Sequence, residues 1–318
     1  AEVIGSAIAL NLLFGLPLIL GVCLTACDVL AVLYLQNRGF RIIEALVLTL
    51  IGVIAVSFGI QMFLSKPDFG AMALGCLHSS EILHNPAMFY VSIGILGATV
   101  MPHNLYLHSS IAQTRHYELS PKGKREAILF GTIDSTIALF FALFINAAIL
   151  IVAAATFYRS GHHEVAEIQD AYKLLSPLLG VGAASTLFAV ALLASGQNST
   201  LTGTLAGQVV MEGFLRLRLP PILRRLITRV LAIIPAVIVT ALLGESGTAQ
   251  LLILSQVILS MQLSFAVIPL VMFTSDKKKM GEFVNPRWIK IGGWGLGIVI
   301  AVLNAFLLWQ TFTGSAPQ

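Results

Sequence analysis

The chain has 318 residues, of which 57% are hydrophobic and 11% are charged, whereas soluble domains carry about 25% charged residues. The apolar runs are long and do not alternate, which indicates an all-α polytopic membrane protein and excludes a soluble domain or a membrane β-barrel. The formal net charge of +4 is not a nucleic-acid signal, because the basic residues lie in loops between apolar runs.

The apolar runs predict about nine membrane spans. In chain order their approximate bounds are 1–14, 18–36, 42–64, 86–113, 127–157, 175–210, 226–243, 248–273 and 289–312. Gly15, Leu16 and Pro17 predict a turn between the first two spans, and 65–85 is expected to be a polar loop. The chain opens without Met inside an apolar run, so we expect it to be an N-terminally truncated part of a longer protein.

Lys and Arg are distributed unevenly between the loops. Sixteen of the 19 follow spans two, four, six and eight or lie at the adjoining helix ends, and only Lys66, Arg159 and Lys173 fall on the other side. Because basic loops are retained in the cytoplasm, this bias predicts a multi-pass protein of the inner cell membrane with its basic loops cytoplasmic.

The span at 86–113 should be broken in its middle. Pro102 has no backbone N–H and its ring clashes with the carbonyl four residues earlier, while Thr99 and Val100 are β-branched. We therefore expect two half-helices joined by an unwound stretch at 98–103. Such a break is tolerated in a bilayer where it lines a cavity, and in secondary transporters it forms the substrate site.

Met101 stands at this break and is a candidate metal ligand. A thioether is a soft donor that favours late transition metals over Mg²⁺ and Ca²⁺, although Met is also common filler in apolar helices. Thr99 and Ala98 lie three and four residues before Pro102. We therefore expect their carbonyl oxygens to lack helical donors and to be able to face a cation.

Other polar residues in or near the spans are candidates for proton transfer or for packing. His103 suits a proton relay or a hydrogen bond to a neighbouring helix. Glu2, at the start of the first span, could form an ion-paired proton exit with Arg224 and Arg225, which could equally be anchors at the membrane edge. Gln256 is either a ligand of the substrate site or a side chain that hydrogen-bonds to a neighbouring helix.

Several motifs together resemble the Nramp family of proton-coupled divalent-metal transporters. They are GATVMPH at 97–103, LYLHSS at 105–110, AEVIGS at 1–6, GTLAGQVVM at 203–211, the pair at 224–225, LSQV at 254–257 and FTSD at 273–276. The resemblance implies a LeuT-type inverted-repeat fold in a single transmembrane domain over 1–318. Residues 1–64 would be the remainder of the first repeat, 86–273 the second repeat, and 289–312 an additional helix.

The resemblance also implies roles for individual residues. Met101, the Ala98 carbonyl and Gln256 would bind the metal, while Glu2, His103, Arg224 and Arg225 would carry protons. The transported ions would be Mn²⁺ and Fe²⁺, also Cd²⁺ and Co²⁺, with H⁺; no prosthetic group is implied. The family's Asp-Pro-Gly-Asn element, which supplies a metal-binding carboxylate, does not occur in this sequence.

Alternative functions differ in what they would bind. A transporter of the same architecture could carry another solute such as an amino acid, with half-helix N-termini directed at a carboxylate. A membrane metalloenzyme is a third possibility, but His103 and His108 are five residues apart and cannot easily share one metal. A fourth is that these 318 residues alone transport nothing. The sequence therefore favours a metal transporter and not an enzyme.

Overall fold

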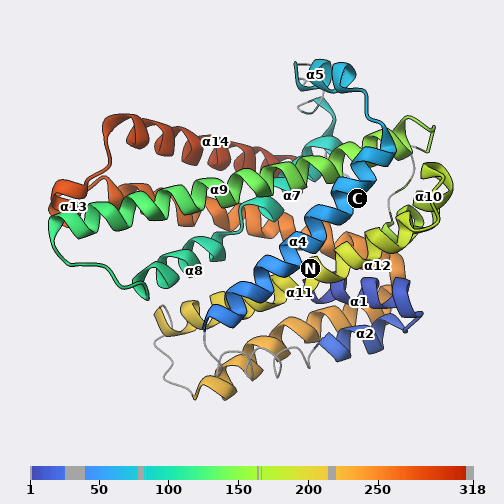
Figure 1. Cartoon of the computed structure of the whole chain (residues 1–318), viewed down its shortest axis with the longest axis horizontal. Helices are drawn as coiled ribbons and strands as arrows, with labels where there is room; N and C mark the ends of the chain where they lie inside the picture. Colours follow the sequence, from blue (N-terminus) through green and yellow to red (C-terminus); the bar gives the residue numbers. More distant parts are fainter. Residues whose placement is uncertain are drawn as a thin grey trace. The chain divides into compact units, whose positions relative to one another are not determined.

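The computed structural model describes residues 2–25, 40–77, 82, 84–162, 165, 167–213 and 220–312. Every regular element in these ranges is helical, which confirms the all-α class. The helices (Figure 1) are α1 (Glu2–Phe14), α2 (Leu18–Thr25), α4 (Phe40–Ser65), α5 (Phe69–Leu77), α7 (Pro86–Thr99), α8 (Pro102–Gln113), α9 (Pro121–Ala153), η1 (Ala154–Tyr158), α10 (Ile168–Leu179), α11 (Ala184–Gly213), α12 (Pro221–Thr274), α13 (Lys277–Met280), η2 (Gly281–Phe283) and α14 (Arg287–Phe312).

Proline and glycine mark the ends of many helices. Helices α7, α8, α9 and α12 each begin with proline, a position where its missing N–H costs nothing because that group has no helical partner. Gly15 has a φ of +67° and ends α1, as the predicted turn requires. Gly180 has a φ of +69° and ends α10. Local backbone chemistry therefore sets these boundaries.

Three predicted boundaries were wrong. The span at 175–210 is two helices, α10 and α11, because the left-handed Gly180 ends the first of them. The spans at 226–243 and 248–273 belong to one continuous helix, α12, since Gly244 and Gly247 cost only about 1 kcal/mol each inside a helix. The loop at 65–85 contains the apolar helix α5.

Four helices in the described ranges are long and apolar enough to cross a membrane. They are Arg41–Ser65, Pro121–Tyr158, Ala249–Thr274 and Arg287–Trp309, and Glu2–Phe14 and Ile233–Leu242 are shorter apolar helices. Residues 26–36 of the second predicted span lie outside the described residues. The count of nine spans therefore stays a prediction.

The chain divides into two compact units. Unit 1 comprises Ala1–Phe69 and Phe130–Leu251. Within it α11 packs on both α1 and α4, and a core of α4, α9 and α11 side chains is formed by Ile54, Phe58, Ala148, Ala191 and Ala194. The ideal Cβ position on Gly196 of α11 lies 3.0 Å from the Ser6 nitrogen of α1. The small residues of α11 thus allow close helix packing.

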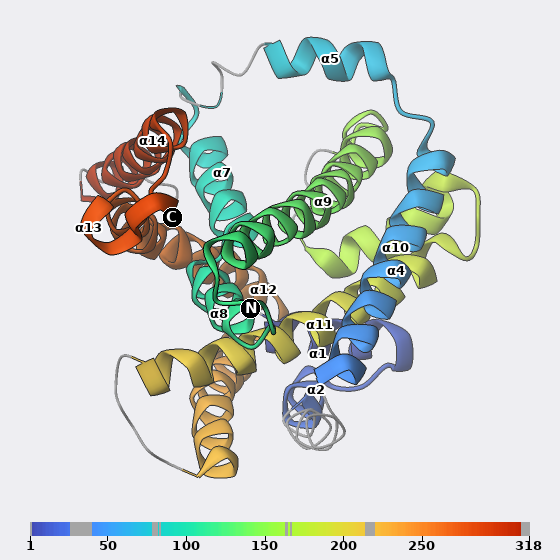
Figure 2. The ribbon, with the colours of Figure 1, turned by 60° about the vertical axis from the view of Figure 1, so that its left-hand side comes forward.

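Unit 2 comprises Gly70–Leu129 and Leu252–Gln318. Its core joins α7, the later part of α12 and α14 through Phe89, Ile93, Val257 and Leu307. Helices α7 and α14 lie side by side (Figure 2). The Phe89 ring of α7 meets the Phe306 ring of α14 edge to face, with 5.1 Å between ring centroids. This core holds the first two turns of α7, the helix that ends at the predicted break.

Much of the helical surface is apolar and exposed. On α9 the exposed side chains include Leu139, Phe140, Phe141, Leu143 and Phe144. Such a continuous apolar face would be unstable in water and matches the hydrocarbon of a bilayer. The exposed apolar surface therefore agrees with a membrane-embedded chain.

Candidate functional site

The interruption between α7 and α8 consists of Val100 and Met101. Helix α7 ends at Thr99 and α8 begins at Pro102, so the two appear as separate coils in Figure 2. Val100 has φ −114° and ψ 80°, and Met101 has φ −75° and ψ 124°. The extended conformation of Met101 is the one that a following proline favours. The unwound stretch is thus shorter than the predicted 98–103.

The interruption leaves the Ala98 carbonyl without its usual donor. The N–H four residues later would belong to Pro102, which has none. The Leu96 carbonyl, two residues earlier, accepts from the Val100 N–H at 2.9 Å. The C-terminal end of a helix carries partial negative charge. The end of α7 therefore offers a carbonyl oxygen to a cation.

Helix α12 approaches this end of α7 at Gly97. An ideal Cβ on Gly97 would lie 1.9 Å from the Gln256 carbonyl oxygen and 2.8 Å from the Ser260 nitrogen. Real Cβ atoms essentially never come this close to backbone atoms. Gly97 is buried and Ala98, which follows it directly, is exposed. The structure thus packs the Gln256 backbone against Gly97, the neighbour of Ala98, within unit 2.

The Gln256 side chain has an unsatisfied oxygen. Its Oε1 atom is buried and has no hydrogen-bond partner, although a buried polar atom without a partner costs roughly 1–3 kcal/mol. Met101 is half-buried on the connection between the two half-helices. An amide oxygen, a peptide carbonyl and a thioether make a mixed donor set that suits a transition-metal ion.

A buried polar pair lies one turn along α12 from Gln256 and was not predicted. Asn304 of α14 donates from Nδ2 to the Ser260 carbonyl at 2.9 Å, and Ser260 Oγ donates to Asn304 Oδ1 at 3.2 Å. Both residues are buried. The signal was available, because an asparagine inside an apolar span requires a hydrogen-bond partner. The pair fixes α14 against the segment of α12 that carries Gln256.

The predicted proton-pathway residues belong to both units. His103 is half-buried in the first turn of α8, in unit 2. Glu2 is half-buried in the first turn of α1, in unit 1. Its Oε2 lies 2.8 Å from the ideal Cβ position on Gly203 of α11, so the absence of a side chain there makes room for the carboxylate. The Arg224 and Arg225 side chains lie outside the described part of the structure.

Clustered metal-binding side chains are missing from the part of the chain that the structure describes. No group of three or more His, Cys, Asp or Glu side chains is close enough there to hold a metal ion. The candidate donors at the α7–α8 break are instead a thioether sulfur, an amide oxygen and a peptide carbonyl. The predicted metal residues Met101, Ala98 and Gln256 all lie in unit 2.

Comparisons with known proteins agree with these features. The sequence profile of the family described as "Natural resistance-associated macrophage protein-like", or Nramp, matches residues 1–310. A Listeria monocytogenes protein named divalent metal cation transporter MntH is 68% identical over 313 residues, which are 98% of this chain and 70% of that protein. A Nostoc protein of the same name is 65% identical over 314 residues, covering 99% and 71% of the two chains.

A solved structure shows the same fold. The crystal structure of the Eremococcus coleocola manganese transporter, in complex with an aromatic bis-isothiourea compound, is 41% identical. It superposes with a TM-score of 0.86 and covers 100% of this chain and 70% of that one. This agreement confirms the expected transporter fold.

Proposed function

This chain belongs to the Nramp family, and on that premise we propose that it carries divalent transition-metal ions, Mn²⁺ foremost, across the inner cell membrane together with protons. The observation that supports the proposal is the two-residue break of Val100 and Met101, next to the close packing of Gly97 on the Gln256 backbone. Relatives named as divalent metal cation transporters share 65–68% of the sequence. Fe²⁺, Cd²⁺ and Co²⁺ would enter the same donor set.

The proposed metal site uses its three donors for different purposes. The Met101 thioether would discriminate against Ca²⁺ and Mg²⁺, which prefer oxygen ligands. The Ala98 carbonyl would replace a water of the hydrated ion at the negative end of α7. Gln256 Oε1, buried without a partner, would gain one in the ion. None of the three donors carries a negative charge. In the family that the chain resembles, the carboxylate ligand comes from an Asp-Pro-Gly-Asn element, which these 318 residues do not contain.

Proton movement would use Glu2 and His103, together with Arg224 and Arg225. A carboxylate and an imidazole can each take up and release a proton while the metal passes. Two arginines at the cytoplasmic end of a helix would stabilise the ionised form of a neighbouring carboxylate between one protonation and the next. Alternating access would expose the site to each side of the membrane in turn, with the basic loops cytoplasmic.

The test is uptake of Cd²⁺ and Mn²⁺ into proteoliposomes with an inward proton gradient and excess Ca²⁺ outside. It compares the 318-residue chain with the complete product of its native gene, and each of them with its Met101→Ala variant. We expect the variant to lose preference for Cd²⁺ over Ca²⁺, while Met88→Ala, an exposed methionine on α7, retains it. Unchanged selectivity in Met101→Ala would remove the ligand role.

The alternative of an amino-acid substrate is tested in the same vesicles. The N-terminus of α8 begins at the break and could hold a carboxylate. Inhibition of uptake by amino acids, with no inhibition by Mn²⁺ or Cd²⁺, would support that alternative. If neither metal enters and the proton gradient has no effect, the proposed metal transport is refuted.

A further inference from the structure

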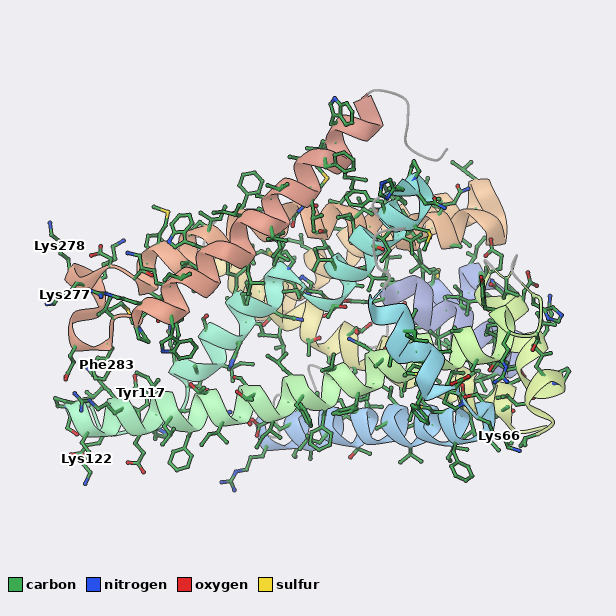
Figure 3. The ribbon with its side chains drawn as sticks, turned by 90° about the horizontal axis from the view of Figure 1, so that it is seen from above. Lys66, Tyr117, Lys122, Lys277, Lys278 and Phe283 are labelled. Atoms are coloured by element: carbon green, nitrogen blue, oxygen red, sulfur yellow. The ribbon has the colours of Figure 1, made fainter. Side chains whose placement is uncertain are left out.

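One end of unit 2 carries a dense group of cations. We call this surface the basic face and define it by the basic side chains of residues 115–126 and 276–290, all of which are exposed: Arg115, Lys122, Lys124, Arg125, Lys277, Lys278, Lys279, Arg287 and Lys290. Figure 3 shows Lys122, Lys277 and Lys278 at one end of the ribbon together with Tyr117 and Phe283. Two segments far apart in the sequence therefore present their cations together.

Specific contacts hold these two segments in place. Arg125 Nη2, at the start of α9, lies 2.8 Å from Glu282 Oε2 of η2 and joins one segment to the other. Asn285 Nδ2 donates to Thr274 Oγ1 at 2.8 Å and closes the connection between α12 and α14. The Gly123 N–H donates to Ser120 Oγ at 3.1 Å at the start of α9. These contacts fix the two segments of the basic face relative to each other.

Acidic side chains do not neutralise this surface. Residues 115–126 and 276–290 contain nine basic and four acidic residues, a net charge of +5. Two of the acids have structural partners: Glu282 pairs with Arg125, and Asp276 Oδ1 accepts from the Lys278 N–H at 2.8 Å as the N-cap of α13. These contacts engage two acids. Lys279 Nζ lies 3.9 Å from the centroid of the Phe273 ring, which leaves the exposed Lys277 and Lys278 as the α13 side chains that most readily meet an external anion.

Apolar side chains at the same level indicate the depth of the basic face in a membrane. Trp288 is 75% exposed at the start of α14, Ile291 is 72% exposed one turn later, and Leu119 is 77% exposed beside α9. Tryptophan and tyrosine collect at the boundary between hydrocarbon and head groups. The cations beside Trp288 and Tyr117 would therefore lie at the level of the lipid phosphates, which distinguishes this face from a docking site for a soluble polyanion.

We propose that the basic face binds the head groups of anionic phospholipids in the leaflet that it meets. The proposal relies on the membrane placement given under the proposed function, and it identifies a lipid partner there. The ligand is a phosphodiester with a net negative charge. Clusters of four to eight Lys and Arg side chains at the end of a membrane helix attract such lipids, and each basic side chain contributes separately to the binding free energy. Lipid binding at this face would hold the α12–α14 connection and the start of α9 at one depth.

The experiment measures lipid bound to the purified chain by native mass spectrometry in detergent, with phosphatidylglycerol and phosphatidylcholine of the same acyl chains. The test variant is Lys277→Gln/Lys278→Gln/Lys279→Gln. The matched control is Lys66→Gln/Arg159→Gln/Lys173→Gln, which removes the same charge from outside the basic face. We expect the test variant to weaken phosphatidylglycerol binding by about tenfold or more, and the control to leave it unchanged.

A second variant, Lys122→Gln/Lys124→Gln, tests the other segment and should weaken binding severalfold. Equal loss in the test and control variants would overturn the proposal, as would equal binding of the two lipids. Displacement by inorganic phosphate, an acidic peptide or an oligonucleotide at concentrations matching the lipid would also overturn it. The measurement needs neither metal nor gradient, so its result is independent of whether the chain transports Mn²⁺.

Discussion

Replacing Gly97 with alanine tests the closest approach between α7 and α12. The added Cβ would lie 1.9 Å from the Gln256 carbonyl oxygen, whereas ordinary van der Waals contacts begin at 3.4 Å, so the backbones must separate by about 1.5 Å. The obstructing atoms are a carbonyl oxygen and the Ser260 nitrogen, neither of which can move by a side-chain rotation. The change therefore shifts the helix that carries Gln256 relative to Ala98.

The energetic cost follows from this geometry. Overpacking a close-packed interior costs roughly 1–3 kcal/mol, and Gly97→Ala should lie near the upper value because only backbone movement relieves the overlap. Alanine regains about 1 kcal/mol of helix propensity over glycine, which offsets part of the cost. We expect the midpoint of thermal unfolding in detergent to fall by on the order of 5 °C. Metal uptake should fall further, because the displaced groups are the proposed donors.

Gly94, one turn earlier on α7, provides the control. An ideal Cβ there lies 3.6 Å from Ile253 Cγ2 and 3.7 Å from Val257 Cγ2, which are ordinary contacts. Gly94→Ala should therefore match or slightly exceed the native chain in stability. If Gly97→Ala and Gly94→Ala unfold at the same temperature and transport equally well, the close approach does not constrain the site and the argument fails.

Three further changes have expected outcomes. Gly203→Ala should displace the flexible side chain of Glu2, whose Oε2 would lie 2.8 Å from the new Cβ. We expect an altered pH dependence of uptake with an unchanged unfolding midpoint. An unchanged pH dependence with a lowered midpoint would argue against a role of Glu2 in proton transfer. Asn304→Leu removes both hydrogen bonds to Ser260 and should cost roughly 1–3 kcal/mol, whereas Ser260→Ala removes one and should cost less in the same thermal assay. Asn85→Ala removes the side chain that accepts from the first backbone N–H groups of α7 at 3.0 and 3.3 Å and should lower stability by about 1 kcal/mol; an unchanged midpoint would show that this cap contributes nothing.

The sequence was most informative where a single residue determines the backbone. Pro102 predicted the break because it lacks an N–H, and Gly15 with Pro17 predicted the turn after α1. The contact of Gly97 with Gln256 could not be predicted in this way, because it joins helices far apart in the chain. The sequence suggested both residues as local features, but only the fold shows that their backbones meet.

Hydropathy was a poorer guide to helix ends. It merged α10 with α11, because the residues around Gly180 are as apolar as the helices that they separate. It divided α12 at Gly244, because a short polar run resembles a loop even where the helix continues. Average polarity reports the surroundings of a segment, whereas helix continuity depends on φ, ψ and hydrogen bonds at each residue.

The contact at Gly97 also limits how unit 2 can deform. Two backbones that touch directly have no rotamers between them to absorb a displacement, so the end of α7 and the adjoining turns of α12 must translate and rotate as one body. The nearest compliant joint is the pair Val100 and Met101, where the helical hydrogen-bond ladder is interrupted. Any hinge motion of α8 relative to α7 is therefore concentrated in these two residues. One of them, Met101, is also the residue that carries the sulfur.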